Sequence, residues 1–162
     1  MELTKKERTI KYVVYAVIIA VLSLFQNVGG LWFEIGGARC FFLIPAAVLL
    51  SLDEDEKTAA LIGLFAGLLW DITAAHHMGF NCLFIMVSCY IMSVLVTHLF
   101  RATFWVGTVG AVLFTFLYVL IYWLIFVLIK GGDGSGVAFF NFYLPSFFYT
   151  AVMTVVMNIA FV

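Results

Sequence analysis

The sequence predicts an all-α membrane protein: a compact bundle of six transmembrane helices forming one integral-membrane domain over residues 1–162. Hydrophobic residues make up 65% of the chain and charged residues only 10%. A soluble domain carries about 25% charged residues, so a water-facing fold with this composition would expose large apolar patches. In lipid, helices of about 20 apolar residues pair their own backbone polar groups. The bilayer is therefore the solvent that this composition fits.

Six apolar segments are long enough to be considered as membrane-spanning helices. Their expected bounds are residues 12–28, 37–52, 58–75, 79–97, 103–129 and 137–162. The first follows a basic stretch, as in a signal peptide, but it lacks a small-x-small cleavage site and further segments follow it. We therefore interpret it as a retained helix. The connections are short, which is typical of a compact bundle.

Two of these segments are irregular. The second carries Arg39 and Pro45, and its apolar stretch, residues 40–50, is too short to cross a bilayer unaided. We expect a full crossing, with Arg39 reaching an interface and neighbouring helices satisfying the carbonyl that Pro45 leaves free. A tilted, kinked or re-entrant segment is the alternative. The sixth segment contains Asn141 and Pro145, and its helix is expected to begin near Pro145.

Basic residues set the expected orientation, because Lys and Arg concentrate on the cytoplasmic side of membrane proteins. With six crossings and a cytoplasmic N-terminus, the residues facing inward are Lys5, Lys6, Arg8, Lys11, Lys57 and Arg101, and those facing outward are Arg39 and Lys130. Both termini are therefore expected to be cytoplasmic. The acidic run 53–56 would cap the third helix. A docking site for a basic cytosolic partner is the alternative for this run.

A stripe of small residues ending in an acid marks the third segment. Residues 59, 63, 67 and 71 recur every four positions and share one helical face. Gly63 and Gly67 would let another helix approach closely, either a neighbour or one from a partner. Asp71 lies about 20 Å along its helix, where a carboxylate must be protonated or paired. We expect Asp71 to cap or staple the outer loop; ligand binding and proton relay are the alternatives.

Several residues near Asp71 in the sequence could pair with its carboxylate. The candidate partners are Thr73, His76, His77 and Arg39. Gly79 supplies a permissive turn before the fourth helix, and Asn81 lies near the head of that helix. His76 and His77 with Cys82 could be metal ligands, but nothing fixes a third and fourth ligand, so no metal site is expected.

The remaining polar features indicate packing rather than chemistry. Ala16 and Ala20 form a second small-residue pair, and Gln26 belongs to the polar outer end of the first helix. The three cysteines form no C-x-x-C pair and are expected to be buried apolar side chains. No hydrolase, metalloprotease or nucleotide-binding motif is present, so neither an enzyme nor a bound cofactor is expected. A net charge of −1 argues against nucleic acid as a partner.

The helix order and one set of residues resemble the rod shape-determining protein MreD family. The set comprises Gln26 at the end of the first helix, a proline in the second, the pattern Gly63-x-x-x-Gly67-x-x-x-Asp71, and Gly79 at the next turn. The resemblance implies a non-catalytic scaffold in the bacterial cytoplasmic membrane. Such a scaffold binds the single-span protein MreC and helps to link MreB filaments, directly or indirectly, to the cell-wall synthases of the elongation complex, with membrane lipid as its surroundings.

The chain also resembles the substrate-binding membrane subunit of energy-coupling-factor vitamin transporters, in its size, its six-helix plan and the Ala16-x-x-x-Ala20 pair. This alternative implies an outward pocket in which polar and aromatic groups converge. The residues that could supply these groups are Trp70, Asp71, Asn81, Tyr90 and Trp123. A lipid-modifying enzyme is a third class, and it lacks the necessary nucleophile or metal set.

Overall fold

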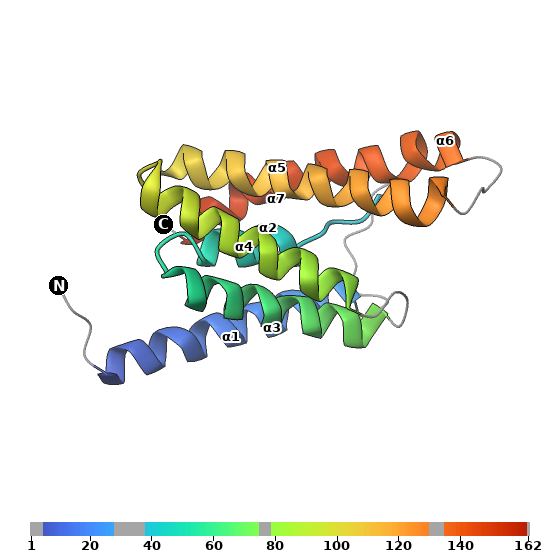
Figure 1. The fold of residues 1–162 in the computed structure, drawn as a ribbon. Helices are drawn as coiled ribbons and strands as arrows, with labels where there is room; N and C mark the ends of the chain where they lie inside the picture. The colour runs from blue at the N-terminus through green and yellow to red at the C-terminus, as the bar shows by residue number, and fades with distance from the viewer. Residues whose placement is uncertain (1–4, 28–37, 75–78, 130–134, 162) are drawn as a thin grey trace.

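A computed structural model describes residues 5–27, 38–74, 79–129 and 135–161, and most of these residues are helical (Figure 1). The α-helices are α1 (Lys5–Asn27), α2 (Leu43–Leu50), α3 (Glu56–Ala74), α4 (Phe80–His98), α5 (Phe104–Tyr122), α6 (Ser135–Ala138) and α7 (Leu144–Phe161). Two π-helical stretches, η1 (Trp123–Leu128) and η2 (Phe139–Tyr143), continue α5 and precede α7. The prediction of an all-α chain is confirmed for the described residues.

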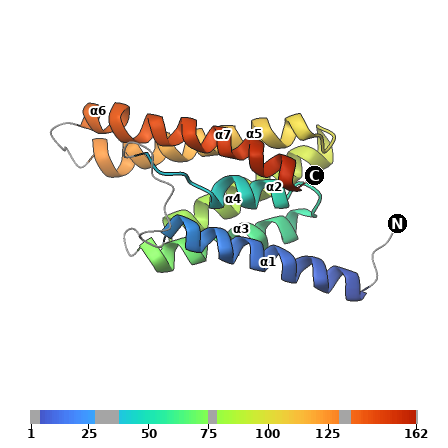
Figure 2. The same cartoon turned by 180° about the vertical axis from the view of Figure 1, so that it is seen from behind.

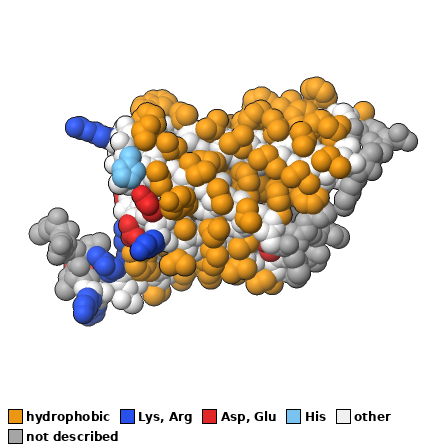
Figure 3. Space-filling view, in the orientation of Figure 1, with side chains coloured by type: hydrophobic (Ala, Val, Ile, Leu, Met, Phe, Trp, Pro, Cys, Tyr) orange, Lys and Arg blue, Asp and Glu red, His pale blue; other side chains and the backbone are white. Residues whose placement is uncertain are grey.

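Successive parts of the chain run in alternating directions between the two ends of the bundle (Figures 1 and 2). The start of α1 and the end of α7 lie at the same end. Lys, Arg, Asp and Glu side chains gather at this end, while hydrophobic side chains cover the length of the visible face (Figure 3). We call it the charged end. The opposite end, where α1 and α3 finish, is called the far end.

Four helical stretches are long and apolar enough to cross a membrane: Lys5–Asn27, Phe80–His98, Phe104–Leu128 and Phe139–Phe161. Apolar side chains project outward from them, including Val17 at 56% exposure, Trp105 at 72% and Val152 at 63%. These surfaces require an apolar solvent. The described residues thus form a membrane protein. Helix α3 carries Glu56, Lys57 and Asp71 and is not one of these four stretches.

The predicted helix over residues 37–52 is wrong in its first half. Residues 38–42 are not helical, and α2 has only eight residues. At about 1.5 Å per residue α2 is about 12 Å long, well short of a bilayer core of about 30 Å. Pro45 explains where the helix starts, because its ring nitrogen has no hydrogen to donate to the carbonyl of Phe41. Pro45 therefore lies in the first turn of α2, not in the middle of a longer helix.

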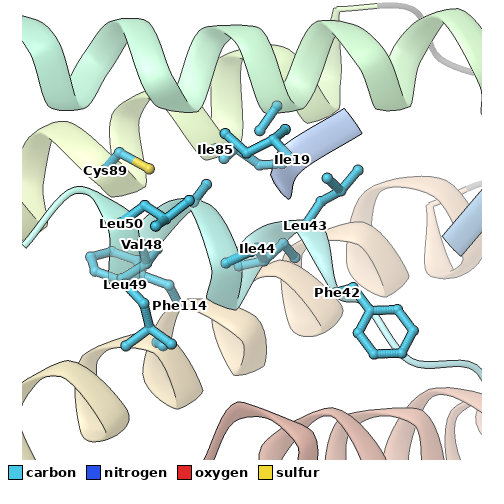
Figure 4. Packing of buried hydrophobic residues seen from close by; sticks show 14 of the residues in the cluster. Ile19, Phe42, Leu43, Ile44, Val48, Leu49, Leu50, Ile85, Cys89 and Phe114 are labelled. Carbon is cyan, nitrogen blue, oxygen red and sulfur yellow. The ribbon is translucent and has the colours of Figure 1, made fainter. Parts of the chain in front are cut away.

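Helix α2 forms the centre of the bundle, and every one of its residues is buried. Its side chains contact apolar residues of several other helices; Ile19, Ile85, Cys89 and Phe114 belong to the same core cluster (Figure 4). Because α2 is apolar on all sides, it has no face suited to water. A short helix can occupy this place because the longer helices surround it.

The other expected bounds differ from the structure in two respects. Helix α1 begins at Lys5, not near residue 12, and includes the basic stretch. Long basic side chains can follow a helix while their heads reach water. Helix α7 begins at Leu144, close to the expected start at Pro145, but helical turns continue back through η2 to Ser135. The π-helical turns of η2 lie where Pro145 cannot supply its backbone hydrogen bond.

Candidate functional site

The small-residue face of α3 packs directly against the backbone of α4. A Cβ atom added to Gly63 would lie 2.6 Å from the carbonyl oxygen of Ile85. One added to Gly67 would lie 2.8 Å from the carbonyl oxygen of Asn81 and would also collide with Cys82. Only glycine fits at these two positions, because any side chain would force the backbones apart. The helix that this face contacts is therefore a neighbour in the same chain.

Asp71 caps α4 from the adjacent helix. Its Oδ2 atom accepts hydrogen bonds from the backbone N–H groups of Gly79, at 3.0 Å, and Cys82, at 2.9 Å. Gly79 occupies the N-cap position with φ = 94° and has no side chain that could serve as the cap. The carboxylate of Asp71, which is 4% exposed, satisfies two of the free N–H groups at this helix start and faces its positive dipole end. The interpretation of Asp71 as a cap agrees with this geometry.

The partners expected for Asp71 are placed elsewhere or lie outside the described residues. The hydroxyl of Thr73 donates to the carbonyls of Leu69 and Trp70, both at 2.9 Å. His76 and His77 lie outside the described residues, and so does any metal site that includes them. No group of three or more metal-ligating side chains occurs in the described parts of the chain. The Oδ1 atom of Asp71 is buried and has no hydrogen-bond partner there.

We call the contact between α3 and α4 one joint of the bundle. A second joint, made by side chains of α7 and α1, holds the non-helical segment 38–42. Ser146 Oγ accepts a hydrogen bond from the backbone N–H of Arg39, and Thr150 Oγ1 accepts one from that of Phe41, both at 3.0 Å. Four residues of an α-helix rise about 6.0 Å along its axis. Two residues of extended chain span about 6.6 Å, which is close to this rise. The two hydroxyls of α7 therefore match the spacing of these two N–H groups.

Gln26 completes this joint from α1. Its Oε1 atom accepts a hydrogen bond from the backbone N–H of Leu43, at 2.9 Å, in the first turn of α2. A short helix in an apolar environment needs such a partner, because its first N–H groups have none within the helix. The Nε2 atom of Gln26 is buried without a hydrogen-bond partner in the described part of the chain. Gln26 is thus a remote cap for α2, as Asp71 is for α4.

The polar stripe on α7 was not predicted from the sequence. Ser146, Thr150, Thr154 and Asn158 are buried and recur every four residues, so they share one helical face. Asn158 Nδ2 donates to the carbonyl of Phe104, at 2.8 Å, and to Thr108 Oγ1, at 2.7 Å. A four-residue period of polar side chains in an apolar helix was the signal that could have found it.

At the charged end, the acidic run is divided between two roles. The Thr58 hydroxyl donates to the Asp55 carboxylate at 2.7 Å and lowers the pKa of Asp55 below its ordinary value. The Asp55 carboxylate also interacts with the backbone of Thr58, so it caps the start of α3, in the way expected of the run. Glu54 instead turns inward, where it pairs with Lys11 Nζ at 2.5 Å and accepts a hydrogen bond from the Tyr12 hydroxyl at 3.2 Å.

A cavity of about 290 Å³ opens beside segment 38–42. Its lining residues are Gln26, Asn27, Arg39, Cys40, Phe41, Trp70 and Thr73. Phe41 and Trp70 form an aromatic pair with ring centroids 5.9 Å apart. Three elements meet here: the end of α1, the segment before α2, and the last turns of α3.

The structure brings together only some of the pocket residues expected for a transporter subunit. Trp70 and Asn81 both contact Tyr118, and the Trp70 and Tyr118 ring centroids are 5.2 Å apart. Trp70 lines the cavity, but Asn81 accepts a hydrogen bond from the Tyr118 hydroxyl at 2.7 Å, and Asp71 caps α4. Tyr90 is 45% exposed on α4, and Trp123 packs against Phe139 at a centroid distance of 5.0 Å. The polar groups of the cavity come from a different set, because the chain is not helical at residues 38–42.

Ala16 and Ala20 are half-buried on α1, which contacts α2 and α3. Cys40 and Cys89 are buried, and Cys82 is partly exposed. No protein-family model, curated protein or solved structure gives a match to this chain.

Proposed function

We propose that the protein is a non-catalytic, six-crossing scaffold of the bacterial cell-elongation complex. In this proposal it lies in the cytoplasmic membrane with both termini and the charged end in the cytoplasm. It binds an MreC-like single-span protein and helps to couple MreB filaments to peptidoglycan synthesis and cell shape. The positive-inside bias of its Lys and Arg residues supports the orientation.

The observation that carries this proposal is the location of the residues on which the MreD resemblance rests. Gln26 caps α2, and Asp71 caps α4. Gly63 and Gly67 allow α3 to contact α4, and Pro45 lies in the first turn of α2. Gln26, Asp71 and the two glycines each join one helix to another. Contacts of this kind hold helices in fixed positions, which supports a scaffold role in this proposal.

Because α4 covers the glycine stripe, a partner helix would dock on an outward face. Helix α1 offers one such face, with Val13, Val17 and Leu24 each more than half exposed. In this proposal Gly63, Gly67 and Asp71 act on partner binding indirectly, by holding the helices that form the surface.

Co-purification from bacterial membranes tests the proposal. Extraction in mild detergent should recover a single-span protein with a periplasmic coiled coil, and depletion of the scaffold should change cell width. Gly67→Leu should abolish recovery, whereas Gly136→Leu, placed where an added Cβ meets nothing within 4 Å, should not. Unchanged cell width and no such partner would contradict the proposal.

A substrate-binding subunit of an energy-coupling-factor transporter is the second candidate function, and the cavity at the far end favours it. The same extraction separates the two candidates. A transporter subunit should be recovered with ATPase subunits and a tightly held small molecule in place of a wall-associated protein.

A further inference from the structure

A groove lies between α4 and α5 near the charged end. The two helices follow each other in sequence and are joined at that end by residues 99–103 (Figure 1). Helix α4 packs mainly against α3, and at Gly110 it meets α5 through the end of the Met92 side chain. A Cβ atom added to Gly110 would lie 2.6 Å from Met92 Cε. A hollow of about 390 Å³ lies at this contact, with Met92 and Gly110 in its lining.

The described lining of the groove is apolar throughout. It comprises Met92, Leu95, Phe100, Trp105, Val106, Val109, Gly110 and Leu113. Phe100, Trp105, Val109 and Leu113 are each more than half exposed, so the groove opens on the surface that faces lipid. Trp105 and Leu113 lie eight residues apart on α5, about 12 Å along the helix. The groove therefore runs from the loop into the depth of the membrane and suits a long apolar chain.

This lining suits an acyl chain better than a partner helix. Helices associate in lipid through small residues that allow close approach and through polar side chains that bond across the contact. The described lining offers no polar side chain, and Met92 covers its glycine. A methionine side chain is flexible and adapts to irregular apolar surfaces. An acyl chain has the same softness and needs no polar partner.

A positive charge stands where the groove meets the loop. Arg101 directly follows Phe100 of the lining and is exposed. Its side chain belongs to no ion pair within the described parts of the chain, where Glu54 pairs with Lys11 and Glu56 with His98. Tryptophan at the same level, here Trp105, is typical of the membrane–water interface. A basic side chain at this level attracts anionic headgroups.

Three further acidic groups come into question as partners of Arg101. Asp53 is exposed and lines a separate hollow of about 360 Å³ together with Ala102 and Thr103. Glu2 and the carboxylate of residue 162 lie outside the described residues. An acid paired with Arg101 would cancel its attraction for an anionic headgroup, so headgroup preference is the quantity to measure.

We propose that the groove between α4 and α5 binds an acyl chain of an anionic phospholipid from the leaflet at the charged end. The chain lies along Val109 and Leu113, and the phosphate headgroup lies at Arg101. This inference goes beyond the scaffold function and does not depend on it.

The test uses the purified full chain in phosphatidylcholine vesicles that contain a minor share of brominated lipid. Bromine near the headgroup end of an acyl chain quenches tryptophan fluorescence at short range. Brominated phosphatidylglycerol should quench more strongly than brominated phosphatidylcholine. This excess should vanish in Trp105→Phe, which keeps an aromatic ring but removes the fluorophore from the groove.

The charge is tested by Arg101→Gln. This variant should reduce the preference for phosphatidylglycerol about fivefold, the contribution expected of one basic residue near an anionic membrane surface. Arg101→Lys should keep most of the preference. Arg8→Gln is the matched control, because it makes the same charge change on α1, outside the lining, and it should behave like the wild type.

The groove itself is tested by Val109→Phe, whose larger side chain should displace the lipid chain and remove the excess quenching. Val152→Phe is the matched control, because Val152 is similarly exposed but lies on α7, outside the lining. Near-ultraviolet circular dichroism checks that both variants fold. If Val109→Phe does not, Leu113→Phe fills the same groove.

Loss of the excess quenching in Arg101→Gln and Val109→Phe, with both controls unchanged, supports the proposal. Equal quenching by the two lipids, an excess that survives Trp105→Phe, or an equal loss in Arg8→Gln would overturn it. Crosslinking that placed a second copy or a partner helix over Trp105 would also overturn it. Partner recovery from bacterial membranes is a separate readout, so failure of the scaffold proposal and failure of this one are distinguishable.

Discussion

The joint between α3 and α4 and the joint around residues 38–50 meet the same requirement in different ways. Both must satisfy backbone N–H groups where no water is available. In the first, two complete helices touch through Gly63 and Gly67, and one carboxylate caps α4. In the second, hydroxyls of α7 and the amide of Gln26 hold a chain that is only half helical.

The two joints differ in how closely the backbones approach each other. Glycines bring the two backbones into contact at Gly63 and Gly67, so we call the α3–α4 joint closed at these positions. A hollow of about 420 Å³ lies beside it, lined by Leu64, Leu68 and other residues of α3 and α4. Side-chain oxygens can satisfy a non-helical chain, but such a chain fills less volume than a helix. The far-end cavity lies beside the second joint, which we call open. In the closed joint backbone meets backbone, and in the open joint side chains hold a segment that is not helical.

The largest expected effect is at the closed joint. Gly67→Leu should destabilise the protein by at least about 3 kcal/mol, because the new side chain meets the backbone of α4, which cannot turn aside. Titration with a denaturing detergent, followed by tryptophan fluorescence, measures the change in the free energy of unfolding. Gly136→Leu is the control and should have little effect. Equal stability of the two variants would show that the α3–α4 contact is not close.

Loss of the Asp71 cap in the same joint should give the second-largest loss of stability. Asp71→Ala leaves two buried N–H groups without an acceptor and should cost about 2–3 kcal/mol. Asp71→Asn keeps one acceptor oxygen and should cost about 1 kcal/mol, so the pair separates charge from hydrogen bonding. The same titration measures both. A loss of equal size for Asn and Ala would mean that the carboxylate charge, not the acceptor, carries the cap.

Single substitutions in the open joint should each cost less stability than those in the closed joint. Ser146→Ala and Thr150→Val each remove one acceptor from segment 38–42 and should cost about 1 kcal/mol. Thr154→Val is a control on the same face of α7, because its hydroxyl donates to the carbonyl of Thr150 in its own helix. Thr154→Val should lose less stability than the other two. If all three variants lose the same amount, segment 38–42 is not held by these hydroxyls.

The smallest effect is expected outside both joints, at the charged end. The pKa of Asp55 is lowered, so its cap stabilises the folded state at neutral pH. This contribution is lost as the pH falls from the ordinary value of an aspartate, about 3.9, through the lowered pKa. Melting temperatures measured over this acid range should show a slightly shallower decline for Asp55→Asn than for the wild type. The exposed position limits the effect to a few tenths of a kcal/mol.

The four stretches that are long and apolar enough to cross a membrane were predictable, because apolar length is a local property of the chain. The role of the 59, 63, 67 and 71 stripe as a contact face was also readable, since a four-residue period fixes a helical face without knowledge of the neighbour. The non-helical segment was not predictable in the same way. Residues 40–50 are apolar and suit either a helix or an extended chain. Only the hydroxyl acceptors of Ser146 and Thr150, more than 100 residues away in sequence, favour the extended chain.

The sequence by itself determined the solvent, the helical class and the face of α3 that makes close contact. Each of these follows from composition or from residues that are adjacent or periodic in the sequence. The tertiary structure decided that α4 covers this face, that Asp71 and Gln26 cap helices other than their own, and that a cavity remains at the far end. These outcomes depend on distances between segments distant in the chain. Such distances are set by how all the helices pack together.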